Sequence, residues 1–165
     1  MSKHKIPTLS IISDESRKKI FSWAEKNSGI ASLVEFLSLK FQVDCTKDRE
    51  IVQAFDRDSS NIQGNAEALC RPVNEHECAL ILTSCQKAKI PVTVSAGRTN
   101  LTGSATPEGG LILSIEKMIT PLIKVDIESQ TITTPVGKYL EEMRMESLKQ
   151  SNNKLYYPVD PTSRE

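Results

Sequence analysis

The chain has 165 residues, of which 38% are hydrophobic and 25% are charged, so it can form one ordinary core or one core with an appended helical segment. The 21 lysines and arginines balance the 21 aspartates and glutamates, and no basic run or pattern of stacking aromatic residues occurs. Binding to nucleic acid is therefore not expected. The sequence has no stretch of about 18 apolar residues that could span a membrane and no apolar signal-peptide region, so we expect a cytoplasmic protein.

The first 55 residues predict three helices, over residues 13–29, 30–41 and 47–55. Ser13 or Asp14 can cap the first helix and Gly29 ends it, and none of the three helices carries residues with evident chemistry. We interpret residues 1–55 as a helical N-terminal extension. The run DRDSSNIQGN that follows concentrates turn-forming residues and predicts a loop or a boundary, so residues 56–165 form the second unit.

Beyond this loop, strands and helices alternate. The sequence predicts a strand over residues 68–70, a helix over 74–88, and strands over 90–94 and 111–115. A hairpin of 122–127 and 131–136 and a helix over 137–150 follow. Asn74, with Glu77 three residues on, predicts a capped start for the first of these helices. The β-branched run at 90–94 predicts a strand that is buried on both faces of a sheet. The last helix should bury Tyr139, Leu140, Met143 and Leu148.

The four cysteines are Cys45, Cys70, Cys78 and Cys85, and their spacing fits neither a zinc ribbon nor a redox CxxC motif. In the cytoplasm such thiols stay reduced, and a free cysteine behaves as a small buried hydrophobic residue. Cys78 and Cys85 share a helix face, but their separation is too long for a pair of ligands to one metal ion. We therefore predict that all four are core residues without a metal or redox role.

The most informative stretch is the loop of residues 95–110, SAGRTNLTGSATPEGG, which directly follows a predicted strand. Gly97 and Gly103 let the main chain approach a diphosphate closely, and the hydroxyl and amide side chains around them can donate hydrogen bonds to phosphate oxygens. The loop lacks the Gly-Lys-Ser/Thr of a Walker P-loop and the GxGxxG of a Rossmann turn. Taken by itself, it is as compatible with an ordinary turn between strands as with an anion site.

The order of motifs around the loop favours the anion site. DRDSSNIQG is followed by CRPV, a helix, IPVTVSAGRTNLTG, LILSIEKM, a hairpin that ends in TPVG, and finally YPVDPTS. This order resembles the FAD-binding domain of the p-cresol methylhydroxylase (PCMH) type, in the vanillyl-alcohol oxidase superfamily. Such domains occur in glycolate oxidase subunits, D-lactate dehydrogenases and alkylglycerone-phosphate synthases, and the resemblance covers roughly residues 50–165.

The resemblance implies an α+β fold, in which N-terminal helices precede the first subdomain of the PCMH-type FAD-binding fold and the start of the second, incomplete at the C-terminus. FAD would lie between the two subdomains, and its binding would be non-covalent because the loop contains no histidine. The residues that the resemblance assigns to cofactor binding are Ser95, Ala96, Gly97, Arg98, Thr99, Asn100, Gly103 and Ser104 in the loop, with Pro158, Asp160, Pro161, Thr162 and Ser163 beside the flavin.

Two loop positions depart from the family pattern. Arg98 stands where members usually have a third glycine, so either the local conformation differs or Arg98 clamps a phosphate, and we favour the clamp. Ser104 replaces another frequent glycine. The chain also ends at Glu165, before the Gly-Gly element, the rest of the FAD domain and the cap domain that supplies catalytic residues in the family, so no catalytic residue is assigned.

The resemblance implies that the complete protein is an FAD-dependent dehydrogenase that moves a hydride from the α-carbon of a small 2-hydroxy acid to the flavin, whereas this chain alone should be nearly inactive. The alternative is an inactive fragment or a subunit that binds a partner chain, or the missing C-terminal half, to complete its flavin site. Other conspicuous side chains are expected to be structural or solvated, namely His4, His76, Glu141, Glu142, Tyr156 and Tyr157.

Overall fold

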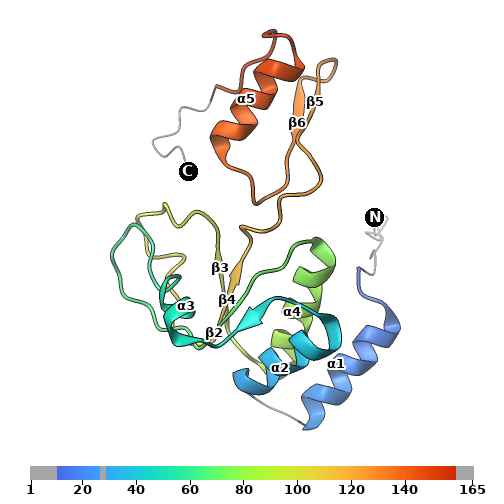
Figure 1. The fold of residues 1–165 in the computed structure, drawn as a ribbon, viewed down its shortest axis with the longest axis vertical. Helices are drawn as coiled ribbons and strands as arrows, with labels where there is room; N and C mark the ends of the chain where they lie inside the picture. The colour runs from blue at the N-terminus through green and yellow to red at the C-terminus, as the bar shows by residue number, and fades with distance from the viewer. Residues whose placement is uncertain (1–10, 27–28, 159–165) are drawn as a thin grey trace, which may run out of the picture.

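A computed structural model describes residues 11–26 and 29–158, and Figure 1 shows two lobes that are connected by the segment between β4 and β5. The larger lobe contains α1 (Asp14–Lys26), α2 (Ile30–Phe41), β1 (Cys45–Thr46), α3 (Arg49–Gln53), β2 (Ala68–Cys70), α4 (Glu75–Ala88), β3 (Val92–Ser95) and β4 (Leu111–Ser114). The smaller lobe contains β5 (Lys124–Asp126), β6 (Thr131–Thr133) and α5 (Leu140–Gln150). Every predicted helix and strand is present, which confirms the α+β class, and β1 is an additional short strand.

The sheet of the larger lobe has the strand order β1-β2-β4-β3, with β2, β4 and β3 parallel and β1 antiparallel to β2. All four residues of the central strand β4 are buried. The strand β3 lies at the edge, and Val94 is 53% exposed, so the prediction that this strand is buried on both faces is wrong. Because the three parallel strands end at one edge of the sheet, the segments that begin at Arg71, Ala96 and Ile115 leave the sheet close to one another.

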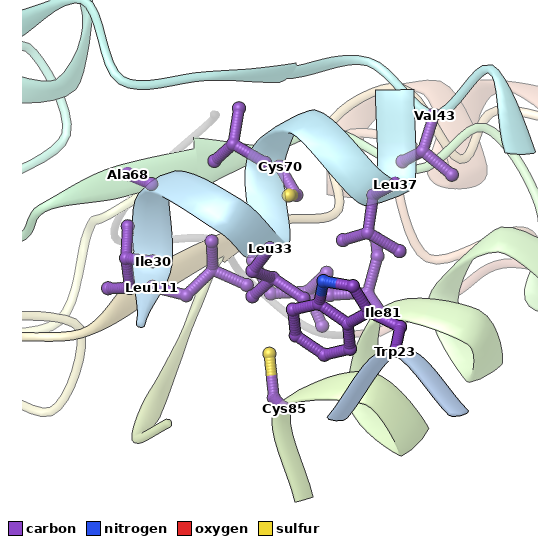
Figure 2. Close-up of a cluster of buried hydrophobic side chains, with 12 residues drawn as sticks. Trp23, Ile30, Leu33, Leu37, Val43, Ala68, Cys70, Ile81, Cys85 and Leu111 are labelled. Atoms are coloured by element: carbon purple, nitrogen blue, oxygen red, sulfur yellow. The ribbon is translucent and has the colours of Figure 1, made fainter. Parts of the chain in front are cut away.

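Helices cover both faces of this sheet. On one face, α1, α2 and α4 pack their apolar side chains against Ala68, Cys70 and Leu111, as Figure 2 shows. On the other face, Val52 of α3 packs with Leu69 and Ile112. The N-terminal helices therefore share a core with the sheet, and α1 and α2 are further joined by the stacked rings of Trp23 and Phe36, whose centroids are 4.8 Å apart.

The N-terminus of α4 shows the cap that the sequence predicts. The Asn74 side-chain oxygen accepts a hydrogen bond of 2.9 Å from the Glu77 backbone N–H, and the Glu77 carboxylate accepts one from the Val73 N–H. We expect Asn74→Ala to lower the free energy of unfolding by about 1 kcal/mol, because the replacement leaves a helix N–H without its acceptor. Urea denaturation measures the change, with His76→Ala in the same exposed turn as the control, and equal stability of the two variants would contradict the assignment.

Cys70 and Cys85 are buried in the core as predicted, and Cys45 and Cys78 are half-buried against it, but the expectation that all four thiols are reduced is wrong. Cys45 and Cys70 are directly opposed between β1 and β2, and they form a disulfide. Such cross-strand pairing depends on the strand register, which the spacing of cysteines along the sequence does not reveal. Cys78 and Cys85 are free, and burial raises the pKa of the Cys85 thiol to about 12, so this thiol is unreactive.

The smaller lobe packs α5 against the hairpin of β5 and β6 (Figure 1). The Gln150 side chain accepts from the Val125 N–H and donates to the Ile123 carbonyl, each at 3.0 Å. Met143 is buried as predicted, whereas Tyr139 is 56% exposed, so its prediction as a core residue is wrong. In the described part of the chain, no helix combines the length and hydrophobicity that a membrane crossing requires.

Candidate functional site

The loop of residues 96–110 connects the end of β3 to the start of β4, and the segment of residues 56–66 holds it in place. Ser59 donates from its backbone N–H and its hydroxyl to the carbonyl of Arg98, at 3.0 and 3.1 Å. Farther along, Asn65 donates to the Pro107 carbonyl and accepts from the Gly109 N–H, both at 2.8 Å. The turn-rich segment that the sequence suggests as a boundary is thus the support of the Gly/Thr-rich loop.

Asp58 is the centre of this support and is only 6% exposed. Its carboxylate accepts hydrogen bonds from the Ser60 N–H and hydroxyl on one oxygen, and from the Asn100 amide and the Ala105 N–H on the other. The hydrogen bond from the Ser60 hydroxyl, with those from the Ser60 N–H, Ala105 and Asn100, outweighs the effect of desolvation and lowers the pKa of Asp58. Asp58 therefore ties two segments together as an ionised carboxylate.

The supported loop presents many unused hydrogen-bond donors. Within the described residues, no backbone N–H from residue 96 to residue 104 finds an acceptor. At the base of the loop, Ser95 and Ser114 are directly opposed in the ladder, fully buried, and without a hydrogen-bond partner for either hydroxyl. Buried polar groups are normally paired, so the hydroxyls of Ser95 and Ser114 indicate a place that a ligand or ordered water completes. The N–H groups of residues 96–104 belong to exposed or half-buried residues, so they are open to solvent and free to bind an anion.

A cavity of about 600 Å³ lies between the two lobes, beside this loop. The larger lobe lines it with Ala96, Gly97, Thr99, Ile115, Glu116 and Ile119, and the smaller lobe with Thr134, Pro135, Val136, Gly137, Lys138, Tyr139, Leu140, Glu142 and Met143. Because Leu140 begins α5, the N-terminal end of this helix faces the cavity. The positive end of a helix dipole and a wall of free N–H groups both favour an anionic ligand.

Gly137 lies against the main chain of the segment that follows β4. Its N–H donates to the Met118 carbonyl at 2.9 Å. A Cβ atom at position 137 would lie 2.8 to 2.9 Å from the carbonyl oxygens of Ile115, Glu116 and Met118, so no side chain fits there. The width of the cavity therefore depends on a glycine at this position.

Both acidic residues that line the cavity are paired with a cation. Glu116 of the larger lobe accepts from Arg98 Nη1 at 2.8 Å, and Glu142 of the smaller lobe accepts from Lys138 Nζ at 2.7 Å. The hydrogen bond from Lys138, followed by one from the Tyr139 N–H, lowers the pKa of Glu142. The Glu142 side chain is 42% exposed, in line with the expected solvated face, and in addition it borders the cavity at the first turn of α5.

The loop residues that the sequence singles out have different positions around this cavity. Ala96, Gly97 and Thr99 line it, whereas Ser95 lies buried beneath the loop. Asn100 and Ser104 are hydrogen-bonded to one another within the Asp58 network, and Gly103 has a φ of +75° next to Ile62. Pro158 is exposed, and Asp160, Pro161, Thr162, Ser163 and His4 lie outside the described residues.

Arg98 keeps the backbone conformation that a glycine would have. Its φ is +54°, so the alternative that the loop conformation changes at this position is wrong. Its guanidinium lies 4.5 Å from the centre of the Phe55 ring and pairs with Glu116. Arg98 is not among the described residues that line the cavity.

The remaining candidates lie away from the cavity. His76 is exposed in the first turn of α4, and Tyr156 is 55% exposed with its hydroxyl 3.4 Å from Arg144. Asp58, Gly137 and the first turn of α5 were not predicted from the sequence. Asp58 followed by Ser60 has the pattern of an Asx turn, and TPVG places Gly137 in a motif, but neither signal reveals a partner in a distant segment.

The chain is similar to known flavoproteins in sequence. A family model described as "FAD binding domain" matches residues 66–165. A D-lactate dehydrogenase of Anaerostipes hadrus is 34% identical over 115 residues, and the glycolate oxidase subunit GlcD of Bacillus subtilis is 31% identical over 115 residues. Each alignment covers 68% of this chain and 23% of the relative, so the chain spans about a quarter of their length.

Solved structures share the fold. An alkyldihydroxyacetonephosphate synthase has a TM-score of 0.64 at 17% identity, over 74% of this chain and 25% of that protein. A chitooligosaccharide oxidase has a TM-score of 0.59 at 14% identity, over 72% of this chain and 25% of that protein. With the family match over residues 66–165 and the loop geometry, these likenesses show that the chain belongs to the FAD-binding-domain family of flavoproteins, of the p-cresol methylhydroxylase type.

Proposed function

We propose that the cavity between the lobes binds FAD, with its diphosphate on the loop of residues 95–104. The observation that carries the proposal is the row of unpaired N–H groups from residue 96 to residue 104, opposite the N-terminal end of α5. Such donors stabilise a diphosphate without requiring a cation at every oxygen. Pro158 and the segment of residues 160–163 are proposed as neighbours of the flavin on the resemblance of PVDPTS alone.

The rest of the lining suits the other parts of FAD. Ala96 and Gly97 leave room for a close approach of the main chain, and the apolar side chains of Ile115, Ile119 and Val136 can cover a ring system. Both acidic residues of the lining are neutralised by cations, so the cavity does not repel an anion as a pair of free carboxylates would.

We further propose that the complete protein oxidises a small 2-hydroxy acid, because the relatives include proteins named D-lactate dehydrogenase and a glycolate oxidase subunit. When bound, FAD would supply the hydride acceptor for the α-carbon of the substrate, while this chain binds the cofactor and shields it from water. The matched region is 23% of the length of these relatives, and we propose that residues outside it supply the proton acceptor. The chain alone should therefore bind FAD with little or no turnover.

The binding is proposed to be non-covalent. A structural neighbour, the glucooligosaccharide oxidase of Acremonium strictum, has 6-S-cysteinyl, 8α-N1-histidyl FAD, whereas the described cavity lining of this chain contains neither cysteine nor histidine. A cytoplasmic location is part of the same proposal.

FAD titration into the purified chain tests the proposal. We expect quenching or enhancement of flavin fluorescence with saturation, and a rise of the melting temperature with FAD concentration, because a ligand that binds the native state stabilises it. Acid precipitation should then release all flavin into the supernatant. A chain that is folded by circular dichroism but shows neither saturation nor stabilisation would contradict FAD binding, and flavin retained in the acid pellet would contradict the non-covalent mode.

A further inference from the structure

We propose that Arg98 assists FAD binding indirectly, by neutralising the Glu116 carboxylate in the wall of the cavity, and that its guanidinium does not contact the diphosphate. This inference rests on the proposed FAD site and assigns a positioning and charge-balancing residue within it. It differs from the phosphate clamp that the sequence suggests for Arg98.

The Arg98 side chain contacts Glu116 and Phe55. Nη1 lies 2.8 Å from Glu116 Oε1, and the guanidinium carbon lies 4.5 Å from the centroid of the Phe55 ring. The carbonyl of Arg98 is also held by the N–H and hydroxyl of Ser59, which fixes the backbone from which the side chain extends. One edge of the guanidinium therefore contacts Glu116, and one of its faces contacts the Phe55 ring. Glu116 lines the cavity, whereas Arg98 does not.

The charged residues that line the cavity show why Glu116 needs a cation beside it. Its charged lining residues are Glu116, Lys138 and Glu142, and Lys138 is paired with Glu142 at 2.7 Å. Among the described residues, Arg98 is the one cation that forms an ion pair with Glu116. The neighbouring Lys117 pairs with Asp44 instead. Without Arg98, the carboxylate of Glu116 would face the diphosphate uncompensated, and two like charges in a partly enclosed cavity repel each other.

The backbone of Arg98 has a conformation that favours glycine. Arg98 has a φ of +54°, in the left-handed region that a glycine adopts without a steric penalty. An arginine here strains the loop, so its presence calls for a compensating interaction, and the pair with Glu116 is the one that the structure shows. Glycine relieves this strain and so offsets the loss of the pair with Glu116 and of the Phe55 contact. Arg98→Gly should therefore keep the fold, which circular dichroism checks, and it is a usable test variant.

The experiment compares FAD affinity in the natural chain, Arg98→Gly, Glu116→Gln and the double variant, by fluorescence titration at low ionic strength. We expect Arg98→Gly to bind FAD about tenfold more weakly, because Glu116 is left unpaired near the diphosphate. Glu116→Gln should bind at least as tightly as the natural chain. The double variant should regain the natural affinity to within about twofold, because neither charge remains.

Each other outcome has a definite meaning. If the double variant binds as weakly as Arg98→Gly, the guanidinium contacts the phosphate itself and the inference is overturned. If Glu116→Gln weakens binding as much as Arg98→Gly, the ion pair acts as a structural brace, and the inference is equally overturned. Unchanged affinity in Arg98→Gly overturns it as well. Failure of the natural chain to bind FAD would instead refute the proposed function on which the inference rests.

Discussion

Replacement of Gly137 by alanine is expected to weaken FAD binding about hundredfold, which corresponds to about 2.7 kcal/mol. The added Cβ would lie 2.8 to 2.9 Å from the carbonyl oxygens of Ile115, Glu116 and Met118. These contacts are with backbone atoms, which cannot turn aside as a flexible side chain can, so the segment before β5 and the segment before α5 must move apart. Both segments line the cavity, and its two walls would therefore separate.

Gly109→Ala is the matched control for this variant. Nothing lies within 4 Å of the added Cβ at Gly109, although its φ of +81° adds a strain that Gly137 does not have. The control should thus lose some stability without a specific loss of FAD affinity. Affinity in each variant is measured by flavin fluorescence, and folding by circular dichroism. Natural FAD affinity in a folded Gly137→Ala chain would show that the contact between the lobes does not shape the site.

Local patterns were sufficient to predict the helices. The Asn74 cap and its Glu77 partner lie three residues apart, and the apolar stripe of α2 lies within one helix, so both are visible in a short window of sequence. The position of the Gly/Thr-rich loop was predictable for the same reason, because it directly follows β3.

Features that depend on distant segments were not predictable in this way. The edge position of β3 follows from a strand order in which β4 lies between β2 and β3, and no residue of β3 encodes that order. Helix periodicity places Glu142 on one face of α5, but it does not say that this face meets the other lobe across a cavity. Asp58 and Asn100 are 42 positions apart, and their hydrogen bond forms only when the whole lobe folds.

Asp58→Asn should weaken FAD binding about thirtyfold and lower the melting temperature of the chain without FAD. The carboxylate accepts from two donors of Ser60 on one oxygen and from Asn100 and Ala105 on the other. An amide of the same shape offers one acceptor oxygen and turns its NH₂ group towards donors on the other side. The loop of residues 96–104 would lose half of this attachment and with it the fixed direction of its N–H groups.

The pH dependence of stability should show that the ionised carboxylate of Asp58 causes the stability loss in Asp58→Asn. Hydrogen bonds, chiefly from the Ser60 hydroxyl, hold the pKa of Asp58 below its usual range, so its contribution to stability is fully present above the pKa of about 3.9 of an unfolded chain. This contribution is lost as the pH falls through the lowered pKa of the folded state, and the stability difference between the natural chain and Asp58→Asn should shrink over that interval.

Asp126→Asn provides the matched control for Asp58→Asn. Asp126 also accepts two backbone N–H groups, and hydrogen bonds from Ser129 likewise lower its pKa, but it lies in the hairpin away from the loop. Both variants should lose stability at neutral pH, whereas only Asp58→Asn should lose FAD affinity. Equal FAD affinities in the two variants would show that the loop keeps its geometry without Asp58. A thirtyfold difference would show that a residue without a place in the cavity lining sets the affinity, because it fixes the backbone that binds the diphosphate.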